Sequence, residues 1–123
     1  MNPIGWFEIY VEDLDACTAF YEKTLDVKLV PNEVPMPNLE MRMFPADYES
    51  YGASGAICRM KGVPTGTNST MVYFSCEDCS VPESKVAEAG GEVVASKFSL
   101  GKHGFITVAK DPDGNTIGFH SMN

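Results

Sequence analysis

The chain repeats one pattern, and the repeat limits the folds that it can adopt. The segment 7–13 alternates apolar and polar residues and ends in an acidic pair, and the segment 72–78 reads the same way at an offset of 65 positions. Alternation of this kind indicates a half-buried strand, and an acidic residue directly after it is typical of a helix start. Each half is therefore predicted to begin with a strand that leads into a helix.

The repeat predicts an α+β fold in which two tandem βαβββ modules form a curved mixed sheet around a cleft. The helix of each module can cover only one face of its small sheet, so the modules need each other to bury their apolar residues. A chain of 123 residues is typical of one domain. We expect a single domain over 1–123, with the first repeat at about 1–61 and the second at about 69–123.

Local signals place the elements inside each module. Asp13 is a suitable N-cap for a helix. The apolar residues after it recur every three or four positions and predict a buried stripe on that helix: Leu14, Cys17, Tyr21 and Leu25. Helices are predicted at 14–24 and 80–89, and strands at 4–11, 27–30, 39–44, 55–61, 70–76, 92–96, 104–109 and 115–120. The loop 31–37 and the linker 62–68 carry prolines and glycines that interrupt these elements.

The charge and the composition exclude some classes of protein. A net charge of −8 argues against nucleic-acid binding, which needs a surplus of Lys and Arg. No apolar run approaches the roughly 20 residues of a membrane helix, so no membrane partner is expected. The start, Met1 to Trp6, lacks the basic and apolar regions of a signal peptide, and we expect a cytoplasmic protein. The acidity either serves solubility or forms an acidic cleft that attracts a cationic ligand.

Two segments carry a resemblance to a known superfamily. The first comprises Val11 to Leu14, followed by Phe20, Tyr21 and Leu25. The second is Asp111 to Asn115, which also suits a type I turn. Together they resemble the vicinal oxygen chelate superfamily, which includes glyoxalase I, extradiol dioxygenases, fosfomycin-resistance enzymes and bleomycin-binding proteins. The resemblance extends over nearly the whole chain and implies the same two-module fold.

The resemblance also implies where a metal would bind, and the residues at those positions do not suit one. The family holds a divalent metal with His and Glu side chains on inward-facing strand positions. The corresponding residues here are Trp6, Met71, Gly118 and, near the fourth position, Cys58. Hard and borderline divalent metals need carboxylate or imidazole donors. We therefore expect no metal cofactor and no glyoxalase I activity.

Glu8 and His120 are the candidate catalytic residues. Each lies two positions beyond a lost ligand position, so both are expected on the cleft face of their strands. A half-buried carboxylate beside an imidazole can move a proton near neutral pH, and the pair would then serve acid/base catalysis without a metal. Two alternatives stay open. One is a non-standard metal site with Cys58 as the third ligand, and the other is a structural pair that bonds to itself or to the backbone.

Apolar side chains are expected to line the cleft, namely Trp6, Met60, Met71, Tyr73 and Phe105. They either fill the cleft or leave a pocket in which a planar organic molecule stacks on Trp6 and Tyr73. Cys58 and Gly118 would belong to the wall of the same pocket. The loop 48–52 contains two tyrosines and would act as a lid over the pocket or as a dimer contact.

Three functions are consistent with these residues. The first hypothesis is a metal-free protein that binds a small organic molecule, as in the bleomycin-resistance branch of the superfamily. The alternative is a lyase, an isomerase or a dioxygenase-type enzyme that uses Glu8 and His120 or a non-standard metal site. The third is a structural or regulatory protein whose cleft is filled. The resemblance implies a homodimer in each case, because relatives commonly dimerise.

Overall fold

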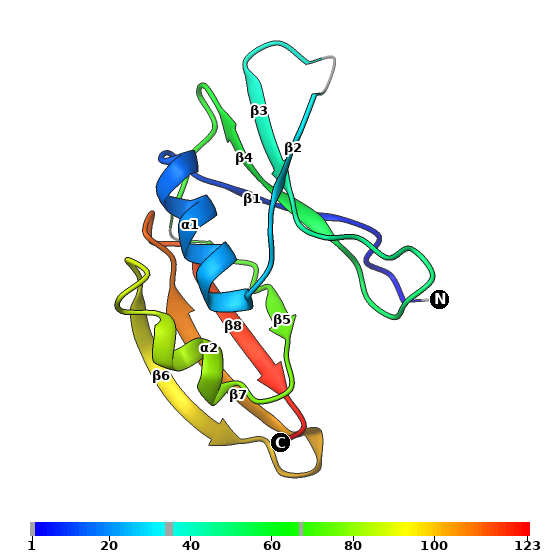
Figure 1. Ribbon diagram of the computed structural model, residues 1–123, viewed down its shortest axis with the longest axis vertical. Coiled ribbons are helices and arrows are strands. Elements are labelled where there is room, and N and C mark those ends of the chain that lie inside the picture. Colours follow the sequence, from blue (N-terminus) through cyan, green and yellow to red (C-terminus); the bar gives the residue numbers. More distant parts are fainter. Residues whose placement is uncertain (1, 34–35, 67) are drawn as a thin grey trace.

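The structure is a computed structural model and describes residues 2–33, 36–66 and 68–123. The first module consists of β1 (Phe7–Tyr10), α1 (Leu14–Leu25), β2 (Val30–Asn32), β3 (Leu39–Met43) and β4 (Gly55–Met60). The second module consists of β5 (Tyr73–Ser75), α2 (Ser80–Lys85), β6 (Glu92–Ser99), β7 (Phe105–Lys110) and β8 (Thr116–Ser121), with a short 3-10 helix at Gly101–His103. Both modules thus contain a strand, a helix and three further strands (Figure 1).

Each module forms a four-stranded mixed sheet. The strand order is β1-β4-β3-β2 in the first sheet and β5-β8-β7-β6 in the second. The pairs β1–β4 and β5–β8 are parallel, and the other neighbouring strands are antiparallel. The predicted α+β fold of two βαβββ modules is confirmed. Because β1 and β5 are edge strands, the first strand of each repeat has an open side.

The two helices lie beside each other on one side of the molecule (Figure 1). Asp13 caps α1 as predicted, since its side chain accepts a hydrogen bond of 3.0 Å from the Ala16 N–H. The predicted apolar stripe faces the interior, because Cys17 and Tyr21 are fully buried. Within the described residues, no helix has the length and apolar character that crossing a membrane requires.

One hydrophobic core joins the modules along α1. The ring of Tyr21 lies 5.6 Å from that of Phe44 in the first module and 5.7 Å from that of Phe74 in the second. The Tyr21 hydroxyl donates a hydrogen bond of 2.8 Å to Asp111, which is also buried. Burial, together with the charge of Asp111, raises the pKa of Tyr21 well above its usual value. α1 thereby holds both sheets together.

The turn before β8 binds the start of α1. The Gly114 N–H donates to the Asp111 carbonyl at 3.0 Å, as a type I turn requires. One carboxylate oxygen of Asp113 accepts hydrogen bonds from the backbone N–H groups of Glu12 and Asp13, at 2.9 and 3.0 Å. Negative charge is favourable at a helix N-terminus, where such N–H groups lack helical partners. We refer to these two bonds of Asp113 as the inter-module link.

The strand after α1 lies later in the chain than predicted. β2 starts at Val30 and includes Pro31, whereas a strand over 27–30 was expected to stop before this proline. The proline is tolerated because β2 is an edge strand. The predicted loop 31–37 and linker 62–68 each contain residues outside the described ranges.

The second module departs from the prediction around its helix. α2 ends at Lys85 instead of residue 89, and the chain leaves it through turns that close at Gly90, whose φ is 98°. β6 continues to Ser99, beyond the predicted end at residue 96. Its backbone is bonded to α2, because the Lys97 N–H donates a hydrogen bond of 2.6 Å to the Glu83 carboxylate. The extension of β6 beyond residue 96 is thus accompanied by this hydrogen bond to α2.

Candidate functional site

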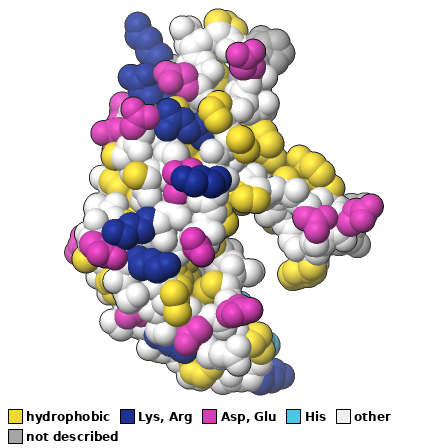
Figure 2. Space-filling view, viewed as in Figure 1, with side chains coloured by type: hydrophobic (Ala, Val, Ile, Leu, Met, Phe, Trp, Pro, Cys, Tyr) yellow, Lys and Arg dark blue, Asp and Glu magenta, His cyan; other side chains and the backbone are white. Residues whose placement is uncertain are grey.

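A groove of about 830 Å³ lies between the two modules. Its walls come from the segments 2–7, 45–54 and 70–75, that is, from the chain up to β1, the loop from β3 to β4 and the chain through β5. Figure 2 shows the molecule hollowed between the arm formed by the first two segments and the second module. Small-molecule sites commonly have volumes of about 300 to 1,000 Å³, so the groove has the size of a binding site.

Three of the predicted ligand-binding residues meet in this groove. Trp6, Met71 and Tyr73 all lie on its walls, with 37%, 36% and 46% of their surface exposed. Trp6 belongs to the first repeat and the other two residues belong to the second, so the relative placement of the modules creates the groove. An exposed aromatic wall of this kind can stack against a planar organic molecule.

Tyr73 packs on Gly118, the position at which the family resemblance implied a glutamate ligand. The two residues are neighbours in the β5–β8 register, and Gly118 is buried. A Cβ atom at Gly118 would lie 2.4 Å from two ring carbons of Tyr73, far inside van der Waals contact. The tyrosine ring therefore occupies the space that a side chain at position 118 would need. Gly118 shapes the groove only by supporting Tyr73.

Glu8 is held by two aromatic residues, Trp6 just before β1 and Tyr10 within it. Its carboxylate accepts a hydrogen bond of 3.1 Å from the Trp6 indole N–H and one of 2.8 Å from the Tyr10 hydroxyl. The hydrogen bond to Glu8, and then burial, raises the pKa of Tyr10 to about 12. Glu8 contacts the groove through Trp6 but does not line it.

His120, in β8, bonds to the 3-10 helix that precedes β7. Its Nε2 atom lies 2.7 Å from the carbonyl oxygen of His103, so Nε2 carries a hydrogen and donates it. Among the described residues, no hydrogen bond or ion pair joins His120 to Glu8. The structure thus holds the two candidate catalytic residues by separate contacts, and their joint action stays a prediction.

Cys58 does not offer a ready metal ligand. It lies in β4 opposite Tyr10 and is completely buried. Burial, followed by the charge of Glu8, raises the pKa of its thiol to about 12. A metal binds the thiolate and not the thiol. Across residues 2–33, 36–66 and 68–123, no three His, Cys, Asp or Glu side chains gather closely enough to hold a metal ion. The donors near Cys58 therefore do not fit the divalent metal that the resemblance implied.

The loop from β3 to β4 supplies groove residues that the repeat did not reveal. Asp47 and Tyr51 lie on the groove from this loop, and Tyr51 is 92% exposed. The loop has no regular apolar spacing, so the sequence located it only as a lid or a dimer contact. Conversely, Met60 and Phe105 do not line the groove. Phe105 packs against the main core, with the Lys97 ammonium 4.7 Å from its ring centre.

A family model matches this chain over residues 3–119. The model describes the Glyoxalase/Bleomycin resistance protein/Dioxygenase superfamily. Among curated proteins, the chain is 28% identical over 109 residues to CFP32 of Mycobacterium tuberculosis, which bears a provisional name as a glyoxylase. The match covers 89% of this chain and 40% of that protein, so the chain spans less than half the length of this curated relative.

Solved structures with the same fold include glyoxalase I from Zea mays and a glyoxylase/bleomycin resistance protein/dioxygenase domain from Frankia sp. EAN1pec. The maize enzyme aligns with a TM-score of 0.75 and 23% identity, covering 98% of this chain and 46% of the enzyme. The Frankia domain aligns with a TM-score of 0.73 and 21% identity, covering 98% of both chains. Likeness at this level of identity shows a shared fold and leaves the activity open.

Proposed function

The chain belongs to the glyoxalase/bleomycin resistance protein/dioxygenase superfamily, and we propose that it binds a small organic molecule in the groove, without a divalent metal and without glyoxalase I activity. The observation that carries this proposal is the meeting of Trp6, Met71 and Tyr73 on one open groove. Two of these residues stand where the resemblance implied metal ligands, and Tyr73 fills the space of a third. We place this function in the cytoplasm, which fractionation of the cells that make the protein would test.

Fluorescence of Trp6 offers a direct binding test, because it is the only tryptophan in the chain. We expect planar aromatic compounds to change its emission in a saturable way. Tyr73→Ala removes a stacking surface and should weaken binding about tenfold, or about 1.4 kcal/mol. Tyr48→Ala is the matched control, since Tyr48 is 82% exposed and does not line the groove. Failure of a broad panel of such compounds to bind the wild-type protein would refute the proposal.

Calorimetric titration of metal-stripped protein under reducing conditions tests the metal-free part of the proposal. Nickel, zinc, manganese and ferrous ions should show no stoichiometric binding tighter than about 10 μM, or about −7 kcal/mol. Tight binding that is lost in Glu8→Gln or His120→Ala would instead establish a metal site built from these residues. It would favour a lyase or dioxygenase-type activity over simple binding.

The alternative function is acid/base catalysis through Glu8 and His120. In its favour, Trp6 and Tyr10 hold the Glu8 carboxylate in a fixed position beside the groove. A positioned carboxylate can accept a proton from a bound substrate. Loss of turnover in His120→Ala, with ligand affinity unchanged, would establish this enzyme-type function. Equal turnover in Glu8→Gln, in His120→Ala and in the wild type would exclude acid/base catalysis by this pair.

The proposed macromolecular partner is a second copy of the chain. Met41, Ala56 and Cys58 form a buried cluster with the half-buried Tyr10, Leu39 and Met43 on one face of the first sheet. α1 packs on the opposite face of this sheet. The half-buried side chains of the cluster therefore stay partly exposed, and a second copy of the chain would cover them. Sedimentation should show a dimer, and Met43→Glu should shift it towards monomer. A monomer at all accessible concentrations would contradict the proposal.

A further inference from the structure

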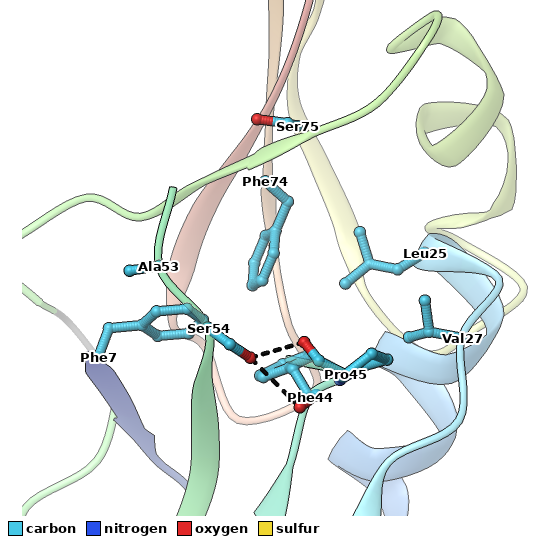
Figure 3. A pocket seen from close by; sticks show the side chains of 9 residues that line it. All are labelled: Phe7, Leu25, Val27, Phe44, Pro45, Ala53, Ser54, Phe74 and Ser75. Carbon is cyan, nitrogen blue, oxygen red and sulfur yellow. Dashed lines mark hydrogen bonds between the residues drawn. The ribbon is translucent and has the colours of Figure 1, made fainter. Parts of the chain in front are cut away.

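A second cavity of about 220 Å³ lies beside the groove and shares six of its lining residues. We call this cavity the recess. Figure 3 shows that the side chains of Phe7 and Phe74 point into it from one side and those of Leu25 and Val27 from the other. Phe7 and Phe74 also line the groove, so the two cavities adjoin at these residues. A ligand in the groove therefore lies next to the recess.

The walls of the recess suit an apolar group. The ring centres of Phe7 and Phe74 each lie within 6 Å of that of Phe44, at 5.6 and 5.4 Å. The Ser54 hydroxyl lies 2.8 Å from the Pro45 carbonyl and 3.2 Å from the Phe44 carbonyl, so its single hydrogen is already used (Figure 3). An apolar cavity of about 150 Å³ can hold a benzene molecule. The recess is thus large enough for one aromatic ring or a short alkyl chain.

Among the described residues that line the groove, Asp47 is the one with a charged side chain. The Glu49 N–H donates a hydrogen bond of 3.0 Å to one carboxylate oxygen, and the Ser50 hydroxyl donates to the other. These bonds lower the pKa of Asp47, the Ser50 hydroxyl having the larger effect. No Lys, Arg or His of the described residues pairs with Asp47. In Figure 2, acidic side chains stand on the arm beside the hollow, and no Lys or Arg is visible there.

From these features we propose that the ligand is an amphiphilic amine, a conclusion that rests on the binding function proposed above. Its aromatic or aliphatic group enters the recess, and its ammonium group lies in the groove beside Asp47. The rings of Trp6 and Tyr51 are exposed on the same groove and can contact the cation through their faces. Asp47 and the recess together select for a molecule that is charged at one end and apolar at the other.

Other ligand classes fit these walls less well. An anionic ligand would meet the Asp47 carboxylate in a protein whose net charge is −8, and none of the described residues that line the groove or the recess is basic. A fully polar neutral ligand would have to leave the recess empty or place polar groups against phenylalanine rings, where they would lose their hydrogen bonds to water. The amine is favoured because it satisfies both cavities at once.

Three compounds of similar size test the ligand class: 4-phenylbutylamine, 4-phenylbutanol and 4-phenylbutyrate. In Trp6 fluorescence titrations at low salt, the amine should bind about fivefold tighter than the alcohol, because Asp47 is exposed and a solvated ion pair contributes little more than that. The butyrate should bind most weakly. The preference for the amine should shrink at about 0.5 M salt, where exposed charges are screened.

Asp47→Asn and Glu49→Gln separate the proposed contact from the general charge of the protein. Both variants remove one negative charge from the same exposed loop, but only Asp47 lines the groove. Asp47→Asn should reduce the ratio of amine to alcohol affinity to about one, whereas Glu49→Gln should leave it unchanged. An equal effect of the two variants would show that the net charge, and not Asp47, attracts the amine, and would overturn the assignment of Asp47.

Val27→Phe tests the recess by filling it. It should weaken binding of all three compounds about tenfold, since the phenyl group loses its apolar site. Val30→Phe is the control, because Val30 is exposed and outside both cavities. If Val27→Phe does not fold, Ala53→Leu narrows the same cavity from an exposed loop position and should weaken binding similarly. Unchanged affinities in a folded filling variant would overturn the role of the recess.

The outcomes also distinguish this inference from the proposed function. Equal affinity of the wild-type protein for the amine and the alcohol would overturn the amine class while leaving the groove as a binding site. Absence of binding by all three compounds, together with binding of other planar molecules, would do the same. Absence of any binding to the groove would overturn both proposals.

Discussion

α1 and α2 hold equivalent places in the two modules, yet they differ in length and in what they bury. α1 has 12 residues, a side-chain cap and a stripe of buried residues that reaches both sheets. α2 has six residues, no side-chain cap, and buries Pro82 within its length and Cys79 and Val86 beside it. The repeat is therefore one of topology, and the first helix contacts aromatic residues of both modules through Tyr21.

Equivalent residues have taken different roles at the start of each helix. Asp13 caps α1 by accepting the Ala16 N–H. Asp78, which stands at the same place in the second repeat, instead accepts hydrogen bonds from Ser80 and pairs with the Lys97 ammonium at 2.9 Å. The comparison shows that the acidic residue bonds to a backbone N–H of the following helix in both modules, and that Asp78 forms an ion pair as well. The tertiary surroundings decide whether the ion pair forms.

The largest difference should appear when proline is placed at equivalent positions of the two helices. Ala19 and Ser84 lie 65 residues apart, and both are exposed. Ala19→Pro interrupts the middle of α1 and should lower the free energy of unfolding by about 3 kcal/mol or more, or prevent folding. Ser84→Pro affects only the last turn of α2 and should cost less. Urea unfolding of both variants measures this, and equal losses would contradict the central role of α1.

Removal of the inter-module link should have the next largest effect. Asp113→Ala leaves the N–H groups of Glu12 and Asp13 without their partner, and should lower the free energy of unfolding by about 2 kcal/mol. Asp113→Asn keeps one acceptor oxygen and should recover part of the loss. Chemical unfolding followed by circular dichroism provides the measurement. Wild-type stability in Asp113→Ala would show that the inter-module link contributes nothing beyond the core and the Tyr21–Asp111 hydrogen bond.

The contact between Tyr73 and Gly118 differs from its counterpart in the first module, where Glu8 lies opposite Ala56. Gly118→Ala should cost about 1 to 3 kcal/mol because the new methyl group collides with the ring. In a Tyr73→Ala background the same substitution should cost much less. A double-mutant cycle by urea unfolding measures the coupling. Equal costs in the two backgrounds would mean that Tyr73 does not occupy the space above Gly118.

The smallest effect concerns Asp78 and depends on pH. The hydrogen bonds from Lys97 and Ser80 lower the pKa of Asp78 from 3.8 to about 2. The folded state therefore favours the ionised carboxylate. Its contribution to stability is complete above a pH of about 4 and disappears as the pH falls through about 2. The stability difference between wild type and Asp78→Asn should be small at pH 7, decline over this acidic range and shrink with salt. A difference that grows on acidification would contradict this account.

Much of the fold could be predicted because its signals are local. The spacing of Cys17 and Tyr21 is a property of any helix that buries one side, and Asp13 caps α1 as its position indicated. The turn that closes at Gly114 forms as its residues predicted. The end of α2 could not be predicted in this way, because the residues after Lys85 are compatible with a helix or with the turns that the structure shows.

The candidate site, like the fold, could be predicted only in part. Alternation along the strands placed Trp6 and Tyr73 on one side of their strands, and the structure brings both to the groove. Phe7 follows Trp6 directly, and alternation alone would put the two side chains on opposite faces, yet both line the groove. The hydrogen-bond partners of Glu8 and His120 could not be predicted either, because several nearby polar groups could bond to each of these side chains.

The sequence alone determined the repeat and the order of elements, because strand alternation and helical spacing depend on residues close together in the chain. Tertiary structure decided where Asp47 stands, how the recess meets the groove, and that Tyr73 covers Gly118. Each of these depends on the distance between segments remote in sequence. That distance is set by the packing of α1 and both sheets in one core, and no local sequence pattern specifies it.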